Sequence, residues 1–177
     1  MLEQGLVQVY TGKGKGKTTA ALGLAFRAAG HDLKTLMIQF MKETDLCCGE
    51  LISVEMHDPL ISIKRFGGNF LDGYTQKKFK SVQERIRIGI ARAAEVIAKH
   101  EVDVLILDEI GEAIGHGLVD VDDIMKLIDH KPKTMEIVLT GRFMPEELIE
   151  RADLVTEMKE IRHPFKAGVK ARKGIEY

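Results

Sequence analysis

The sequence lacks the features that mark secreted and membrane-spanning proteins. Its only two cysteines, Cys47 and Cys48, are adjacent, and no disulfide framework is expected because neighbouring cysteines rarely bridge without a strained backbone. No apolar run approaches the roughly 18 residues that a membrane span needs. Residues 1–5 carry neither the cationic nor the apolar segment of a signal peptide. We therefore expect a soluble protein of the reducing cytoplasm without a membrane partner.

The sequence also has almost no net charge. Its 26 Lys and Arg residues nearly balance its 27 Asp and Glu residues, which argues against a protein that wraps nucleic acid or an anionic membrane electrostatically. Its 177 residues, 45% of them hydrophobic, suffice for one domain with its own core. We therefore expect a single domain over residues 1–177 and no nucleic-acid partner.

Short apolar runs alternate with segments of helical periodicity along the chain. Helices are expected at about 18–29, closed by Gly30 as a left-handed C-cap, at about 75–99, at about 120–130, and after Pro145. Residues 41–60 and 66–74 are irregular and too long for simple connectors, so they are candidate ligand-holding loops. The alternation predicts an α/β fold, a three-layer parallel sheet with helices on both faces. Strands are expected at 6–10, 33–40, 61–66, 102–107, 135–140 and 154–158, most of them buried on both faces.

The segment Tyr10–Thr19 follows the first predicted strand and opens the first predicted helix. Its glycines allow successive backbone N–H groups to turn towards phosphate oxygens, and the helix N-terminus adds the positive end of its dipole. Lys17 would bridge the terminal phosphates, and the Thr18 hydroxyl would help to hold a divalent metal ion. Because Thr11 stands where the usual motif has a glycine, the loop is unusually compact. The alternative is a surface turn rich in Gly and Lys, but the flanking strand and helix favour a phosphate-binding loop.

A second signal is Val104–Glu109, an apolar strand that ends in two carboxylates. In a parallel sheet this end lies on the same edge as the phosphate-binding loop, so Asp108 and Glu109 can reach a metal ion directly or through water. Taken alone, Asp108 is equally typical of a helix N-cap. Together with the loop, it predicts a nucleoside triphosphate bound with Mg²⁺.

These two motifs leave the reaction open. Hydrolysis, phosphoryl transfer and attack at the nucleoside C5′ all need the same cradle of N–H groups, lysine and metal. A P-loop ATPase that couples hydrolysis to a conformational change is therefore one candidate. A small-molecule kinase is another, although no Arg-rich lid insertion follows the central helices.

Six segments spread over nearly the whole chain match a known family in order and spacing: Val9–Gly30, Gln39–Lys42, Leu107–Ile110, Leu139–Arg142, Ala152–Met158 and His163–Tyr177. With them the sequence resembles the P-loop ATP:corrinoid adenosyltransferases, which make adenosylcobalamin from ATP and a reduced corrinoid. No single segment would identify the family. The order and spacing of all the segments, together with the compact loop, are specific for it. In this family a cobalt(I) corrinoid attacks the ribose C5′ and the whole triphosphate leaves. The resemblance implies a P-loop NTPase fold of RecA-like type that binds ATP with Mg²⁺ or Mn²⁺.

The resemblance also implies roles for residues by their position. Thr18 and Glu109 should hold the metal ion, with Asp108 beside them, and residues 12–18 should wrap the triphosphate. The residues expected to carry catalysis are Lys17, Thr18, Glu109 and Arg142. The residues expected to bind the substrates are Gly12, Lys13, Gly14, Lys15, Gly16, Lys17, Thr18, Thr19, Arg27 and Phe70.

Both arginines, Arg142 and Arg27, also have a simpler interpretation. Arg142 follows a strand in a Gly-Arg turn and should pair a phosphate, because a planar guanidinium suits two oxygens; the alternative is a surface turn arginine. Arg27 matches a family arginine near the adenosine, yet its position alone favours a solvated helix residue.

On the corrinoid side, an aromatic pair of the family crowds the lower face of the corrin and removes the axial ligand, which makes cobalt(II) easier to reduce. The matching stretch is Phe66–Asp72, where Phe70 fits the first aromatic position, Asp72 stands at the second, and the chain has no tryptophan. This departure predicts a different lower-face mechanism or corrinoid preference. Alternatively, Phe66 and Phe70 are loop residues that pack against the core.

Partners are implied only by the resemblance, which indicates a homodimer and a flavin-based electron donor. Between residues 159 and 173, Lys and Arg outnumber the single acid, Glu160, but Phe165 alone is aromatic. Contact with corrinoid carboxamides, triphosphate or a second subunit therefore fits at least as well as nucleic acid. Cys47 and Cys48 with His57 are expected to be loop residues with free thiols rather than a metal site, because no second Cys/His pair stands at ligand spacing.

Overall fold

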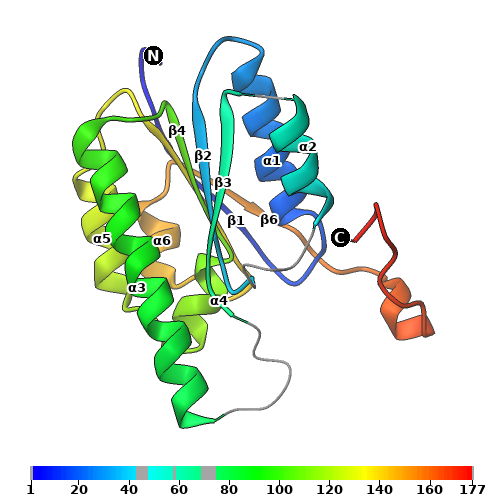
Figure 1. The fold of residues 1–177 in the computed structure, drawn as a ribbon. Helices are drawn as coiled ribbons and strands as arrows, with labels where there is room; N and C mark the ends of the chain where they lie inside the picture. The colour runs from blue at the N-terminus through cyan, green and yellow to red at the C-terminus, as the bar shows by residue number, and fades with distance from the viewer. Residues whose placement is uncertain (1, 43–47, 58, 69–74, 177) are drawn as a thin grey trace.

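The computed structural model describes residues 2–42, 48–57, 59–68 and 75–176. In these residues, six strands form one sheet in the order β3-β2-β4-β5-β1-β6, and every neighbouring pair is parallel (Figure 1). This confirms the α/β class and each of the predicted strands to within two residues at either end. The strands are β1 (Val7–Thr11), β2 (Thr35–Phe40), β3 (Ile61–Phe66), β4 (Val104–Asp108), β5 (Glu136–Thr140) and β6 (Leu154–Glu157).

Helices cover both faces of the sheet and make three layers (Figure 1). Helices α1 and α2 lie on one face, and α3, α4, α5 and α6 lie on the other. Within the described residues, no helix is both long and apolar enough to cross a membrane. The helices are α1 (Lys17–Ala29), α2 (Gly49–His57), α3 (Gln76–Lys99), α4 (Ile110–Gly115), α5 (Val121–Asp129) and α6 (Glu146–Arg151), with a 3₁₀ turn at Pro164–Ala167.

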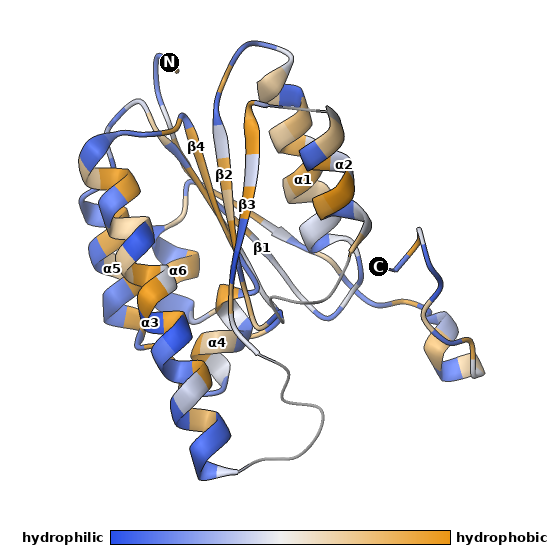
Figure 2. Ribbon diagram, in the orientation of Figure 1, coloured by the Kyte–Doolittle hydropathy of each residue, from blue (hydrophilic) through white to orange (hydrophobic). Residues whose placement is uncertain are grey.

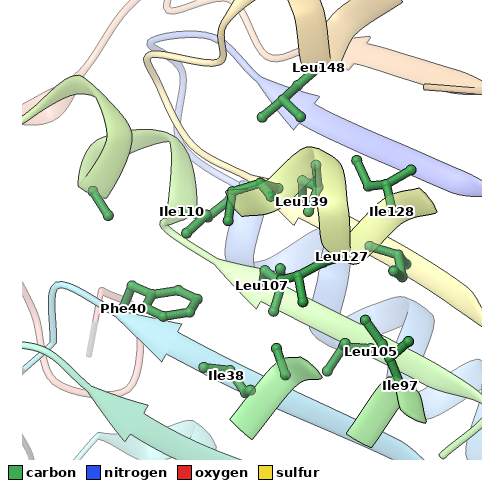
Figure 3. Packing of buried hydrophobic residues seen from close by; sticks show 14 of the residues in the cluster. Ile38, Phe40, Ile97, Leu105, Leu107, Ile110, Leu127, Ile128, Leu139 and Leu148 are labelled. Carbon is green, nitrogen blue, oxygen red and sulfur yellow. The ribbon is translucent and has the colours of Figure 1, made fainter. Parts of the chain in front are cut away.

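Alternation along each strand divides the core between the two faces. In β2, Ile38 and Phe40 pack under the four-helix face (Figure 3). Met37, by contrast, packs with the buried alanines of α1 on the other face. The hydropathy colouring shows the same pattern, with apolar stripes on the helix faces turned to the sheet and polar residues on the outside (Figure 2). Odd and even positions of a strand therefore contact helices on different faces of the sheet. Polar side chains of neighbouring strands can meet only when they point to the same face.

Two local expectations are wrong. Gly30 is not left-handed (φ −62°), because the chain turns once more before Asp32 takes the left-handed conformation (φ 58°) and the Leu33 N–H bonds the Ala28 carbonyl. Residues 41–60 are not irregular throughout, since they contain α2, which buries Val54.

The last strand is an exception to the expected burial of most strands, because it is exposed along its whole length. It is an edge strand that pairs with β1 on one side only. Two short elements also had no counterpart in the sequence pattern, helix α4 and the 3₁₀ turn of the C-terminal tail, which we define as residues 158–176.

Candidate active site

The loop between β1 and α1 is shaped by its glycines. Gly12 and Gly16 have left-handed backbone angles (φ 95° and 117°). A Cβ on Gly14 would lie 2.6 Å from the Met158 carbonyl oxygen, to which the Gly14 N–H donates at 2.6 Å. Gly16 is the N-cap of α1 and has no side chain to occupy the first N–H groups of the helix. These groups are free to receive an anion, as the sequence predicts for a phosphate-binding loop.

Lys17 closes this loop on itself. Its Nζ donates to the carbonyl oxygens of Gly12 (2.7 Å) and Gly14 (2.8 Å). Burial lowers the pKa of Lys17 below its ordinary value, although the nearby Glu112 carboxylate opposes the shift. The ammonium is thus held at the mouth of the loop by neutral acceptors, which an anionic oxygen can replace.

Asp108 ends β4 on the same sheet edge as the loop and is completely buried. One of its oxygens, Oδ1, accepts hydrogen bonds from the hydroxyls of Thr18 (2.9 Å) and Thr140 (2.8 Å). The other, Oδ2, accepts from Gln39 Nε2 (3.1 Å). The predicted proximity of this strand end to the loop is confirmed, and Asp108 meets the loop through the Thr18 hydroxyl.

Glu109 stands in a strained position beside Asp108. Its backbone is left-handed (φ 60°), which is rare outside glycine and indicates a position fixed by its surroundings. Its N–H donates to Thr140 Oγ1 at 2.9 Å. Burial, followed by the charge of Asp108, raises the pKa of the Glu109 carboxyl to about 7. This carboxyl would be stabilised in its charged form by a bound cation.

A turn after β5 brings Arg142 to the same place. A Cβ on Gly141 would lie 2.4 Å from the Gly111 Cα, so the turn packs directly on the start of α4. The backbone N–H of Arg142 donates to Glu112 Oε1 at 3.1 Å, and Arg142 Nε lies 3.7 Å from the same oxygen. The guanidinium remains largely exposed, with 61% of the side chain accessible. Arg142 can therefore swing onto an anion while its backbone stays fixed.

These groups surround one cavity of about 600 Å³, a volume typical of small-molecule sites. The phosphate-binding loop forms one wall, the ends of β4 and β5 form another, and α2 and the tail complete it. The residues that line it are Lys13, Gly14, Lys15, Gly16, Lys17, Thr18, Thr19, Leu22, Lys42, Gly49, Glu50, Ser53, Glu109, Glu112, Thr140, Arg142, Glu160, His163, Gly174, Ile175 and Glu176.

Most of the predicted site residues meet at this cavity, but three of the described ones do not line it. Asp108 is completely buried and reaches the site through the Thr18 hydroxyl. Gly12 lies at the foot of the loop, where its carbonyl holds Lys17. Arg27 is exposed in the third turn of α1, away from the cavity, and its charge acts on Tyr10. Phe70 and Asp72 lie outside the described residues, as does Cys47, whereas Cys48 has a free, buried thiol beside α2.

Several cavity residues were not singled out in the sequence. Lys42 follows β2, and its Nζ lies 3.0 Å from Glu50 Oε1 of α2. Burial alone would lower the pKa of Lys42, but the carboxylates of Asp108, Glu50 and Glu109 raise it. The signal for Lys42 was present, since it stands just beyond the end of a buried strand. Glu50 and the tail residue Glu176 carried no such signal, because their approach depends on tertiary packing.

The oxygen donors of the cavity fit a hard divalent cation. Thr18 offers a hydroxyl and Glu109 a carboxylate, both of which suit Mg²⁺. Among the described residues there is no cluster of three or more His, Cys, Asp or Glu side chains that could hold a metal by itself. So sparse a donor set suits Mg²⁺, which commonly keeps several waters and binds phosphate oxygens of the nucleotide.

Residues 3–177 match the sequence model of a family described as ATP:corrinoid adenosyltransferase BtuR/CobO/CobP. The chain is similar to the corrinoid adenosyltransferase of Sinorhizobium sp, with 37% identity over 176 residues that cover 99% of this chain and 81% of the relative. It is 34% identical to that of Pseudomonas aeruginosa, with 99% and 85% covered. It is 33% identical to that of Escherichia coli K12, with 99% and 87% covered.

A solved structure supports the fold independently. A KaiC-like protein from Pyrococcus horikoshii OT3 superimposes with a TM-score of 0.54 at 17% identity, covering 91% of this chain and 76% of that chain. At this identity the likeness concerns the fold alone, and it agrees with the expected P-loop NTPase fold of RecA-like type.

Proposed function

The chain belongs to the ATP:corrinoid adenosyltransferase family, and we propose that it transfers the 5′-deoxyadenosyl group of ATP to the cobalt(I) of a reduced corrinoid. In this step the electron pair of cobalt forms the Co–C5′ bond. The C5′–O5′ bond breaks at the same time, and the triphosphate leaves with the electrons of that bond. The product is adenosylcobalamin or an adenosylated precursor.

The observation that carries this proposal is the family match over residues 3–177, because the phosphate-binding loop alone would also suit hydrolysis or phosphoryl transfer. The geometry adds a set of cationic and N–H groups around that loop. Negative charge grows on the triphosphate as the C5′–O5′ bond breaks, and preorganised donors aimed at that charge lower the barrier. Lys17, the first turn of α1 and Arg142 lie at one cavity and supply such donors. They would act on a leaving group rather than on a transferred phosphoryl group.

Mg²⁺ or Mn²⁺, when bound, would neutralise part of the triphosphate charge. The Thr18 hydroxyl and the Glu109 carboxylate would hold it. Asp108 contributes through Thr18, because its own oxygens already accept three hydrogen bonds from protein groups.

We propose that the corrinoid binds next to the two candidate ligand-holding loops, residues 41–60 and 66–74. Lys42, Glu50 and Ser53 line the cavity from this side. Phe66 is half-buried against the core, and Phe70 is proposed to contribute to the wall beneath the corrin. We further propose that the enzyme is a cytoplasmic homodimer, that each subunit is a single domain, and that it receives electrons from a reduced flavin.

The test is product analysis under anaerobic conditions. ATP and chemically reduced cobalamin are incubated with the protein and Mg²⁺, and the corrinoid spectrum and the phosphate products are followed together. Adenosylcobalamin with intact triphosphate is the expected result. ADP and phosphate without adenosylated corrinoid would identify an ATPase and overturn the proposal, and ADP with a phosphorylated acceptor would identify a kinase.

A further inference from the structure

A row of polar side chains crosses the carboxyl edge of the sheet, starting at a residue outside the cavity lining. Arg65 of β3 stands opposite Gln39 of β2, and Gln39 stands opposite Asp108 of β4. Arg65 Nε donates to Gln39 Oε1 at 2.9 Å, and Gln39 Nε2 donates to Asp108 Oδ2 at 3.1 Å. The row ends at Thr18, whose hydroxyl donates to the same carboxylate at 2.9 Å.

The direction of this row follows from the chemistry of its members. A guanidinium can only donate and an ionised carboxylate can only accept, so the amide between them must turn its oxygen to Arg65 and its nitrogen to Asp108. Gln39 is completely buried and thereby locked in this orientation. One oxygen of Asp108 is then occupied, and the other is left to the hydroxyls of Thr18 and Thr140.

Arg65 also reaches the wall formed by α2. Its side chain is only 4% exposed, and Nη2 lies 3.7 Å from Glu50 Oε1, the atom that Lys42 Nζ approaches at 3.0 Å. Burying an arginine in a strand is costly compared with an apolar residue, unless the charge is paired and hydrogen-bonded. Here one buried guanidinium joins the cavity wall of α2 to the carboxylate that meets the phosphate-binding loop.

We propose that Arg65 and Gln39 are positioning residues that orient Asp108 so that Thr18 presents its hydroxyl oxygen to the metal ion of bound ATP. This inference rests on the proposed function of the site. Neither residue is required to touch the substrates. Arg65 acts through Gln39, and Gln39 acts through Asp108, so the two residues form a series rather than two independent contacts.

The experiment measures the affinity for ATP by isothermal titration calorimetry, once with Mg²⁺ and once with EDTA, in the absence of corrinoid. The variants are Arg65→Met, Gln39→Met and the double substitution. Each single substitution should weaken Mg²⁺-dependent binding about tenfold, the scale of one hydrogen bond to a charged group. ATP affinity in EDTA should change by less than about twofold. With Mg²⁺, the double variant should lose no more affinity than the single variant with the larger loss, because the groups act in series.

Arg85→Met is the matched control. Arg85 donates to the Gly67 carbonyl at 3.3 Å, close to the end of β3, but has no bond to the row, so its removal should leave both affinities unchanged. Equal losses with Mg²⁺ and EDTA, additive losses in the double variant, or no loss would overturn the proposal. Gln39→Met removes no charge and keeps the test decisive if Arg65→Met does not fold. A wild-type protein that binds Mg²⁺ and ATP as expected but adenosylates no corrinoid would refute the proposed function alone.

Discussion

Two parts of the cavity lining are held by different forces: the phosphate-binding loop with the ends of β4 and β5, taken together as one wall, and the tail, taken as a second wall. The wall built from the phosphate-binding loop, β4 and β5 rests on a completely buried carboxylate with three hydrogen-bond donors and on glycines in direct backbone contact. The tail wall rests on ion pairs at the surface, where Lys15 Nζ lies 2.8 Å from Glu176 Oε1 and Arg172 Nη2 lies 3.1 Å from the same oxygen. Surface pairs contribute little and are screened by salt. The first wall is therefore preorganised to meet charge, whereas the second can rearrange when ligands enter.

The largest effect is expected at the centre of the preorganised wall. Lys17→Ala removes a cation aimed at the charge that grows on the departing triphosphate, and it should lower the rate of adenosyl transfer by roughly 10²-fold or more. The rate is measured at saturating ATP with chemically generated cobalt(I). Lys13→Ala, an exposed lysine of the same loop, is the control and should lose far less. A Lys17→Ala variant with near wild-type turnover would remove this role.

A smaller effect is expected where the two walls touch. Gly14→Ala places a methyl group against the Met158 carbonyl, which lies 2.6 Å from the position of the new Cβ. The start of the tail must shift, and the Gly14 N–H loses its bond to Met158. We expect ATP affinity to fall about tenfold, on the scale of one to two kcal/mol of overpacking. Gly23→Ala is the control, because a Cβ there meets nothing within 4 Å; equal affinities in the two variants would show that the contact between the walls is unimportant.

A third prediction uses the raised pKa of Glu109. Its carboxyl titrates near 7 in the folded chain and near 4.5 when unfolded, so folding favours the protonated form. The free energy of unfolding of the metal-free protein should therefore fall as the pH rises from about 4.5 to about 7. Glu109→Gln removes this loss, and we expect it to stabilise the protein by roughly 2 kcal/mol at pH 8 and hardly at all at pH 4.5.

Urea unfolding in EDTA at both pH values measures this difference. Glu150→Gln, on the exposed side of α6, is the control and should not change the pH dependence. Because Glu109 is also proposed to hold the metal, Glu109→Gln should raise the Mg²⁺ concentration required for activity. Identical stability curves for Glu109→Gln and wild type would show that this burial has no energetic cost.

The same contrast explains how far the sequence could predict the molecule. The preorganised wall depends on local pattern: a strand, a glycine loop and a helix place Lys17 and Thr18, and the end of an apolar strand places Asp108. Parallel pairing then brings these segments to one edge without further information. The register of Gln39 with Arg65, by contrast, depends on which strands become neighbours. The sheet order supplies that information, and the alternation of strands and helices does not.

The tail was recognisable only as a motif. Its basic residues left open a contact with corrinoid carboxamides, triphosphate, a second subunit or nucleic acid. They did not indicate that Glu176 would turn back onto Lys15 of the phosphate-binding loop. Such a contact joins segments far apart in the chain through exposed side chains, and no periodicity reports it. The exposure of β6 was missed for a related reason, because an apolar run does not show whether its strand lies at the centre or at the edge of a sheet.

The smallest effect is expected from the tail itself. Hydrogen bonds from Arg172 and Lys15 lower the pKa of Glu176 to about 2, so this carboxylate stays ionised at every pH at which the enzyme would be assayed. Glu176→Gln weakens the attraction to Lys15 and should change the apparent affinity for ATP by no more than about twofold at low salt. The change should be the same at pH 6 and pH 9, because the Glu176 carboxylate is ionised at both. It should disappear near 1 M salt, where the screening length falls to about 3 Å. A large change that persists in high salt would show that the tail wall is as rigid as the wall it faces.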